Sequence, residues 1–339
     1  MVISTSHSYN EKNRLRYRCL ANGCIMDELA FTVKRCPIPA DRILRSAQTN
    51  SFTLDQFDFK TPVDRSRLYV CPTLTPLYYT ETFQHLAPGQ ARRYNQITAL
   101  CFGELIAFFE ESFELALHGI LACRGRAALE GNIRACVEHF IQEEVKHRQM
   151  WRHLAQLSEP QWYASAPRQI VQIRGSAQRI LRLLTRQPRW FPAVVWVMLA
   201  LEEHSLEISR RCAKMPADQI EPRYAAVYRA HMEEEARHVQ IDWHLLLHLM
   251  QGIPPAMRRL NGWLFRRSMN TFFLRPTRAA ACVIDTLIGE EPDLRPVRRS
   301  IMLQLAALET NDDFRRMMLS PASTPITFAL MDRFTELKP

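Results

Sequence analysis

Two Glu-x-x-His pairs constrain the fold of this 339-residue chain more than any other feature. The pairs are Glu144-Val145-Lys146-His147 and Glu235-Ala236-Arg237-His238, and they lie 91 positions apart. Residues at i and i+3 of a helix share one face, so each segment offers a carboxylate and an imidazole in the same direction. Two such segments that face each other could hold a shared metal centre inside a helix bundle.

Chance alone does not account for the two pairs. With 23 Glu and 11 His in the chain, about 0.7 accidental matches are expected, which is the ordinary false-positive rate of a short motif. Each pair, however, continues an apolar stripe of its helix, for example Phe140, Glu144, His147 and Trp151. Polar side chains on a core-facing stripe are costly unless they are paired or bound to metal.

The chain is expected to be almost entirely helical. Apolar residues recur three and four apart, which predicts long helices at about 91–123, 127–157 and 192–212, a further long helix that begins near 221, and a basic connecting helix at 168–186. Only 10 glycines are present, below the usual share of about 7%, and few glycines imply few strained turns. Prolines at 276, 292 and 321 suggest three shorter helices after residue 254.

This order of helices predicts an all-α, ferritin-like four-helix bundle core. An apolar helix that carries glutamates precedes each Glu-x-x-His helix, so the chain repeats one unit. We divide it into an irregular N-terminal arm packed on the bundle, a helical bundle with two metal ions and C-terminal helices of the same domain, at residues 1–90, 91–250 and 251–339.

Seven side chains are candidate metal ligands: Glu104, Glu144, His147, Glu203, His231, Glu235 and His238. Four carboxylates carry four negative charges, which balance two divalent cations in the bundle interior. Oxygen and nitrogen ligands without thiolates suit iron or manganese as well as zinc. Two choices stay open, because Glu110 and Glu111 rival Glu104 and because Glu202 rivals Glu203.

Four other glutamates near the motifs are expected to form solvated helix faces: Glu138, Glu143, Glu233 and Glu234. The sequence shows no recognised phosphate-binding, dinucleotide-binding or nucleophile motif. A reduced pair of iron ions with open positions activates dioxygen, so the chemistry that the candidate ligands permit is oxidation. Electrons for the reduction of dioxygen would then come from another protein or from a small reductant.

Composition excludes several other classes of protein. The net charge of +9 comes from 38 Arg against 6 Lys, but no nucleic-acid motif accompanies it, so a basic surface that docks an acidic partner is the better interpretation. Nine cysteines without a Cys-x-x-Cys fit a reducing cytoplasm. No signal peptide is apparent, and the longest apolar run, Trp190–Leu201, is too short to cross a membrane.

Three stretches resemble the AurF-like diiron oxygenases, the family of p-aminobenzoate N-oxygenase. They are Tyr94-Asn95 to Gly119, Glu144-x-x-His147, and His231-x-x-x-Glu235-x-x-His238, within residues 75–250. The third histidine, four residues before Glu235, is the specific element. The resemblance implies a helical and often dimeric protein that holds two irons by four Glu and three His. Its motif anchors favour Glu104 over Glu111, and Glu203 over Glu202.

The resemblance implies oxygenation of an amine to a hydroxylamine or a nitro product. The aromatic-acid enzyme has a basic residue shortly after its Tyr-Asn pair, whereas Gln96-Ile97-Thr98-Ala99 follows here, so p-aminobenzoate itself is not implied. Family relatives also act on aliphatic amines or on substrates tethered to carrier proteins.

The leading hypothesis is a cytoplasmic, dioxygen-dependent diiron N-oxygenase of specialised-metabolite biosynthesis. It would use two Fe ions or a Mn/Fe pair, an external reductase or ferredoxin, and a small-molecule or carrier-bound amine. A homodimer is expected, without nucleic acid or membrane. The alternatives are a diiron oxidase that acts on carbon (hydroxylation, desaturation or oxidative cleavage) and a non-catalytic metal-binding bundle.

Overall fold

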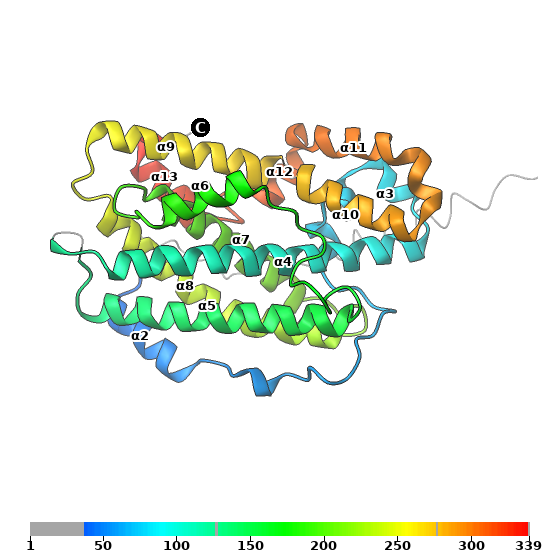
Figure 1. Cartoon of the computed structure of the whole chain (residues 1–339), viewed down its shortest axis with the longest axis horizontal. Helices are drawn as coiled ribbons and strands as arrows, with labels where there is room; N and C mark the ends of the chain where they lie inside the picture. The colour runs from blue at the N-terminus through cyan, green and yellow to red at the C-terminus, as the bar shows by residue number, and fades with distance from the viewer. Residues whose placement is uncertain (1–36, 126–127, 276, 338–339) are drawn as a thin grey trace, which may run out of the picture.

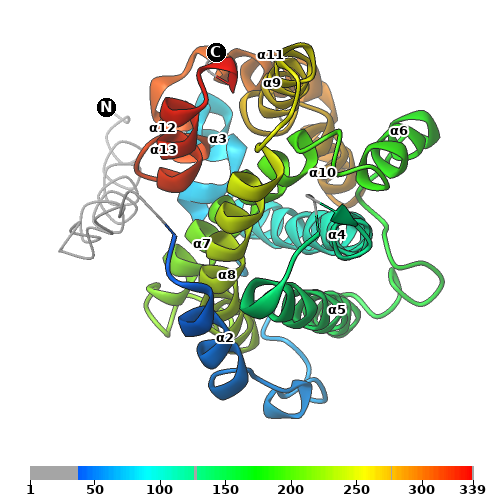
Figure 2. The same ribbon diagram turned by 90° about the vertical axis from the view of Figure 1, so that its left-hand side faces the viewer.

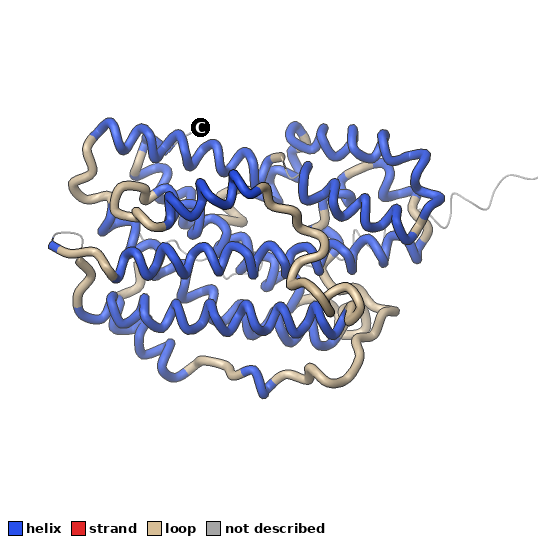
Figure 3. The backbone as a smooth tube through the Cα atoms, in the orientation of Figure 1, coloured by secondary structure: helices blue, strands red, loops and turns tan. Residues whose placement is uncertain are grey.

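The structure is a computed structural model that describes residues 37–125, 128–275 and 277–337. Within these ranges the chain forms helices and loops, with no β-strand beyond an isolated bridge between Leu68 and Ile220 (Figure 3). The prediction of an all-α protein with a helix-bundle core is confirmed.

Four long helices form the core (Figures 1 and 2): α4 (Pro88–Leu121), α5 (Gly131–Ser158), α7 (Ala193–Ala213) and α8 (Pro222–Leu249). Helix α4 packs against α5 and α7, and α8 packs against the same two helices. Each of the four helices thus contacts two others around one interior. The predicted bounds of α4, α5 and α7 and the predicted start of α8 agree with the observed ones to within four residues.

Local sequence explains where α4 and α8 begin. Both start with a proline in the first turn, where its missing N–H costs no hydrogen bond. The side chain of Glu221 also accepts hydrogen bonds from the amides of Arg223 and Tyr224, and so caps α8.

Among the described residues before the bundle, the longest helix is α2 (Ala40–Thr49), which packs against α5 and α8. An irregular stretch follows along the bundle, with α3 (Glu81–His85) and three 3₁₀ turns at Leu54–Gln56, Pro72–Leu74 and Pro76–Tyr79. Residues 1–36 of the predicted arm lie outside the described residues. The division of the chain at residues 90 and 250 stays a prediction.

The connecting helix α6 (Gly175–Thr185) packs on α4 and is shorter than predicted. The residues before it, 169–171, instead turn their backbone amides toward a buried carboxylate of α4. This interaction competes with helix formation.

The prediction of three shorter C-terminal helices was wrong. The described part of this region has five: α9 (Pro255–Met269), α10 (Thr277–Glu290), α11 (Arg298–Ala307), α12 (Asp312–Met318) and α13 (Pro325–Arg333). Short 3₁₀ or π segments at Asn270–Leu274, Pro292–Val297, Leu308–Thr310 and Thr335–Leu337 lie between or after them. The additional break at Asn311 is stabilised by the Asn311 side chain, which caps α12. No helix in the described ranges is long and apolar enough to cross a membrane.

Candidate metal centre

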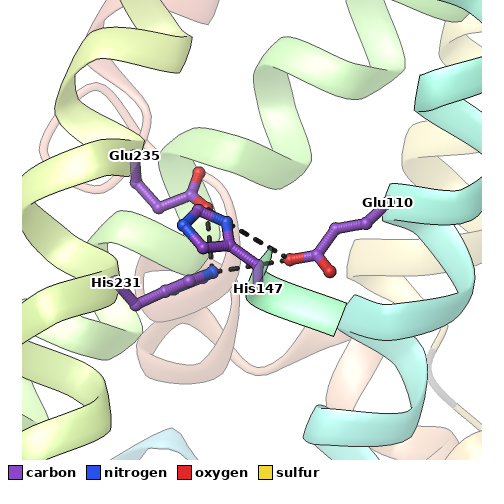
Figure 4. A group of neighbouring side chains, drawn as sticks. All are labelled: Glu110, His147, His231 and Glu235. Atoms are coloured by element: carbon purple, nitrogen blue, oxygen red, sulfur yellow. Dashed lines mark ion pairs between the residues drawn. The ribbon is translucent and has the colours of Figure 1, made fainter. Parts of the chain in front are cut away.

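Two overlapping groups of side chains at the centre of the bundle could each hold a metal ion. One comprises Glu110, His147, His231 and Glu235 (Figure 4), and the other Glu144, His147, Glu235 and His238. In each group the potential ligand atoms lie within 4.8 Å of one another. The two groups share His147 and Glu235, so the two candidate positions for a metal ion adjoin each other.

The distances within this central cluster are short. Nε2 of His231 lies 2.8 Å from Oε1 of Glu235, and Nδ1 of His147 lies 3.3 Å from the same oxygen. Nδ1 of His238 lies 3.1 Å from Oε1 of Glu144. The carboxylate of Glu110 is 3.6 Å from His231 and 3.7 Å from His147. Side chains from α4, α5 and α8 thus converge on one point.

Every side chain of the cluster is buried, and its inward atoms lie close to one another without forming a hydrogen bond of acceptable geometry. The unpartnered atoms are both oxygens of Glu110 and Glu144, Oε2 of Glu235, Nδ1 of His147 and His238, and Nε2 of His231. Buried polar atoms almost always have a partner, so this many unpartnered atoms at one place require an explanation. They are nitrogen and carboxylate donors with the composition of a dinuclear iron or manganese site.

The outward nitrogens of two histidines, in contrast, are paired by carboxylates of the opposite helix. Nε2 of His147 on α5 lies 2.9 Å from Glu234 on α8. Nε2 of His238 on α8 lies 2.9 Å from Glu143 on α5. A proton on Nε2 is thereby held by the carboxylate, which leaves the lone pair of Nδ1 directed into the cluster.

A basic residue completes each of these contacts. Lys146 lies 2.5 Å from Glu234, and Arg237 lies 2.6 Å from Glu143. The prediction that Glu143 and Glu234 belong to solvated faces was therefore wrong, since both are buried in these ion pairs. The other two glutamates of that prediction, Glu138 and Glu233, are exposed.

The third histidine has a different outer partner. Nδ1 of His231 lies 3.2 Å from the hydroxyl of Ser209 on α7. A neutral hydroxyl fixes the ring orientation without adding a charge. The outer nitrogen of His231 therefore has a neutral partner, whereas the outer nitrogens of the two histidines of the Glu-x-x-His pairs have carboxylate partners.

The loop after α2 covers the cluster on one side. The ring of Phe52 stacks on His147 at 5.9 Å, and Lys146 donates to the carbonyl oxygen of Phe52. The Ser51 hydroxyl donates to Glu234. On the other side Phe140 stacks on His238 at 3.8 Å. Aromatic rings thus exclude water from both outer histidines.

Crowding of charges shifts the pKa values in the cluster. Burial and the charge of Glu144 raise the pKa of Glu110 to about 8. Burial would also raise the pKa of Glu235, but the charges of His231 and His238 hold it well below the ordinary value. Burial would lower the pKa of His147, whereas Glu234 and Glu235 raise it. These shifts reflect several buried carboxylates close to one another, and a bound cation would neutralise their negative charge.

Helix α7 contributes Glu202, not Glu203, to this surrounding. Burial together with the nearby charges of Glu235 and Glu144 raises the pKa of the buried Glu202 carboxyl well above its usual value. The carboxylate of Glu203 instead accepts hydrogen bonds from the backbone amides of Ile326 and Thr327, each at 2.7 Å, at the first turn of α13.

The predicted candidate Glu104 is also buried outside the cluster. Its carboxylate accepts a 2.7 Å hydrogen bond from the Tyr163 hydroxyl. It also accepts the backbone amides of Gln169, Ile170 and Val171. The rival Glu111 is exposed. The structure therefore brings five of the seven predicted residues together and places Glu110 and Glu202 where Glu104 and Glu203 were expected.

One further buried acid lies near the cluster. Asp242, one turn after His238 on α8, is fully buried, and neither of its carboxyl oxygens has a hydrogen-bond partner. Burial raises its pKa well above the ordinary value, against the lowering effect of His238. Its place on the inner stripe of α8 follows from the helical period, but its lack of a partner does not.

Comparison with known proteins agrees with this site. No curated protein matches the chain. The family model described as p-aminobenzoate N-oxygenase AurF matches residues 39–292, which is more than half of the chain and includes α4, α5, α7 and α8. The chain therefore belongs to the AurF family of non-haem diiron amine N-oxygenases.

Proposed function

We propose that the protein is a dioxygen-dependent diiron oxygenase that oxidises an amine to a hydroxylamine or to a nitroso or nitro product. The observation that carries this proposal is the set of buried donor atoms without hydrogen-bond partners at the centre of the bundle. Membership of the AurF family supports the reaction type.

The residues present fit two metal ions. We propose as ligands Glu110, Glu144, His147, Glu202, His231, Glu235 and His238. Four carboxylates and three neutral imidazoles provide four negative charges, enough to neutralise two divalent ions. When bound, an iron pair supplies the two-electron chemistry that activates dioxygen and transfers one oxygen atom to the amine nitrogen. Iron is the expected metal, and a manganese and iron pair suits the same donors.

The surrounding residues would keep the imidazoles in the required state. Glu143 and Glu234 hold the outer nitrogens of His238 and His147 at 2.9 Å and so fix the ring orientation. Arg237 and Lys146 keep these two carboxylates ionised by pairing with them. The rings of Phe52 and Phe140 keep water away from the same histidines.

The residues after the Tyr94-Asn95 pair have a structural role that supports a substrate other than p-aminobenzoate. The amide of Gln96 donates to the carbonyl oxygens of Arg65 and Arg67, and Asn95 bonds to the backbone of Tyr69 and Val70. These side chains attach the N-terminal segment to α4. We propose an amine substrate without assigning it an aromatic carboxylate.

Other parts of the proposal concern partners. The oxidation of a primary amine to a hydroxylamine consumes one dioxygen, two protons and two external electrons and releases one water. A reductase or ferredoxin would provide the electrons, and the amine would be free or bound to a carrier protein. A homodimer in the cytoplasm completes the proposal.

Iron loading followed by product analysis tests the proposal. The purified protein is reconstituted with ferrous iron, reduced, and exposed to ¹⁸O-labelled dioxygen with a panel of aromatic and aliphatic amines. We expect two irons per chain and label on the amine nitrogen. Label on carbon would instead indicate a carbon oxidase, and metal binding without oxygen consumption would indicate a non-catalytic metal-binding bundle.

A further inference from the structure

Two segments of the chain contain arginine but no acidic residue. Residues 160–201 and 243–284 hold twelve of the 38 arginines and no Asp or Glu. The first segment includes α6, and the second includes α9 and the start of α10. In both views α6, α9 and α10 lie on the same side of α4 (Figures 1 and 2). The fold therefore gathers charge that is far apart in the sequence.

Direct contacts join the two segments. The side chain of Asn261 on α9 donates to the carbonyl oxygen of Trp190 at 3.0 Å and accepts the amide of Ala193 at 2.9 Å. Residues of both segments also line a pocket of about 410 Å³, formed by Gln172, Ile173, Arg174, Arg278 and Cys282. The two segments thus contact each other and meet at the surface around this pocket.

Eight arginines on this surface are exposed and make no ion pair with any acidic residue in the described part of the chain. They are Arg174, Arg179, Arg182, Arg186, Arg189, Arg259, Arg267 and Arg278, and we call them the arginine face. Like charges gathered without counter-charges repel one another. Such an arrangement favours the approach of an acidic partner.

Large apolar side chains are exposed among these arginines. Six of the ten exposed large hydrophobic residues of the described chain lie in the two segments: Ile180, Leu183, Trp190, Leu260, Trp263 and Phe272. Leu183 is 65% exposed and Trp263 is 55% exposed. Apolar and aromatic residues mixed with arginine are typical of protein interfaces. A second copy of this chain is a poor occupant, because the arginines of the two copies would face each other.

We infer that the arginine face docks an acidic electron-transfer protein of the ferredoxin class. The inference rests on the proposed function, because that reaction needs two external electrons. Each reduced [2Fe–2S] ferredoxin gives up one electron, so two encounters convert a ferric pair into a ferrous pair. The chain itself shows no motif for a flavin or nicotinamide cofactor.

The position of the face suits this partner. Phe272, which is 40% exposed, contacts the ring of Phe109 edge-on at a centroid distance of 5.2 Å. A donor that docks beside Phe272 would be separated from Phe109 by one aromatic contact. Phe109 is the sequence neighbour of Glu110, a proposed metal ligand.

Charge reversal on α6 tests the inference. The face variant is Arg179→Glu/Arg182→Glu/Arg186→Glu. The control is Arg42→Glu/Arg152→Glu/Arg229→Glu, which reverses three exposed arginines on α2, α5 and α8 and changes the net charge equally. The probe is a plant-type [2Fe–2S] ferredoxin, and its dissociation constant is measured with the metal-free chain at several salt concentrations.

We expect the wild-type chain to bind the ferredoxin at low salt and to lose affinity as salt is added. The face variant should bind about 10- to 100-fold more weakly, within the range by which charged surfaces alter association. The control should bind as the wild type does to within about 3-fold. With iron bound, reduction by ferredoxin should slow in the face variant alone, whereas reduction by dithionite should be equal in all three proteins.

Several results would overturn the inference. The first is that the wild type shows no salt-dependent binding of ferredoxin, and the second is that the control variant loses as much ferredoxin affinity as the face variant. The third is that the wild type binds phosphatidylglycerol vesicles in place of ferredoxin. The inference would also be overturned if the face variant bound ferredoxin as tightly as the wild type does and lost turnover only with carrier-bound amines. Because binding is measured without metal, failure of the proposed oxygenation would leave the docking result intact, and the reverse also holds.

Discussion

Buried glutamates in two regions of this protein are equally hidden from solvent but differ in their partners. At the centre of the bundle, both carboxylate oxygens of Glu110 lack a hydrogen-bond donor. Outside this cluster, where the 169–171 segment and α13 pack on the bundle, Glu104 accepts hydrogen bonds from three backbone amides and a tyrosine hydroxyl, and Glu203 accepts hydrogen bonds from two amides. Burial therefore does not distinguish a metal ligand from a structural carboxylate, whereas the saturation of its oxygens does.

The largest effect should follow from removing a central carboxylate. Glu110→Ala and Glu202→Ala should each lower iron content below two per chain and reduce turnover by more than about 100-fold. This loss exceeds the one expected from changing a residue that only holds the outer nitrogen of a ligand histidine. Elemental analysis and oxygen uptake measure both quantities. Glu111→Ala, at the exposed neighbouring position, is the matched control and should behave as wild type. Two irons and full turnover in either central variant would remove that residue from the ligand set.

His231 sharpens the comparison within the centre itself. His231→Ala should leave the helical fold and at least one iron site intact and should lower turnover by about 100-fold or more, because a direct donor is lost. Ser209→Ala, which removes only its outer partner, should cost about 10-fold. Circular dichroism, iron content and product yield separate the two cases. Full turnover in His231→Ala would contradict its assignment as a ligand.

The carboxylates that support the histidines should have an intermediate effect. Glu143→Gln and Glu234→Gln should each weaken metal affinity by about 10- to 100-fold, because the outer nitrogen of one histidine loses its charged partner. Competition with a chelator measures the affinity. Glu138→Gln and Glu233→Gln, at exposed positions, are the controls. Equal metal affinities in all four variants would show that the contacts of Glu143 with His238 and of Glu234 with His147 do not support the site.

The saturated carboxylates should matter for stability and little for metal. Glu203→Ala leaves two buried amides without an acceptor, and Glu104→Ala leaves the buried amide of Ile170, two partly buried amides and the buried Tyr163 hydroxyl, at about 1–3 kcal/mol for each buried group. We expect the free energy of unfolding of the metal-free chain to fall by about 2–5 kcal/mol. Iron content should stay at two per chain. Denaturant titration and elemental analysis check these outcomes, and loss of iron without loss of stability would reverse our assignment.

The smallest effect concerns the pH dependence around Glu104. Burial and the charge of Glu104 raise the pKa of Tyr163 above its ordinary value of about 10. Below pH 10 the hydroxyl keeps its proton in both the folded and the unfolded chain, so its full contribution is present. Above pH 10 only the unfolded chain loses the proton, and stability should fall by up to about 1.4 kcal/mol per pH unit for this residue. Tyr163→Phe should show a shallower decline between pH 10 and 11 in denaturant titrations.

The sequence predicted the helices well because their apolar periods are long and regular. It also predicted Glu144, His147, His231, Glu235 and His238 as one group, since fixed spacing on two helices determines which side chains share a face. The structure places these five together in agreement with that prediction, and their binding of metal stays a prediction.

The choice between neighbouring glutamates could not be predicted in the same way. Helices α4 and α7 are buried around nearly their whole circumference, for example at residues 94–101 and 193–200. A helix that is apolar on all sides gives no preferred rotation, and a turn of about 100° exchanges Glu202 for Glu203. The rotation is instead fixed by distant groups, namely the amides of residues 169–171 and of α13.

The burial of Glu143 and Glu234 also depended on distant residues. Each charge is neutralised by a basic residue of the opposite helix, and the loop at Ser51 and Phe52 covers Glu234. A charged residue beside a motif looks solvated when only its own helix is considered. Tertiary contacts decided the outcome here.

The crossed contacts between α5 and α8 affect how the two halves of this protein can diverge. Glu143 of the first Glu-x-x-His helix supports His238 of the second, and Glu234 of the second supports His147 of the first. Neither half holds the complete set of residues that its own histidine requires. A substitution that one lineage accepts in α5 therefore changes the selective value of residues in α8. We expect the two segments to be inherited and altered together, as one unit of variation, although 91 positions separate them in the chain.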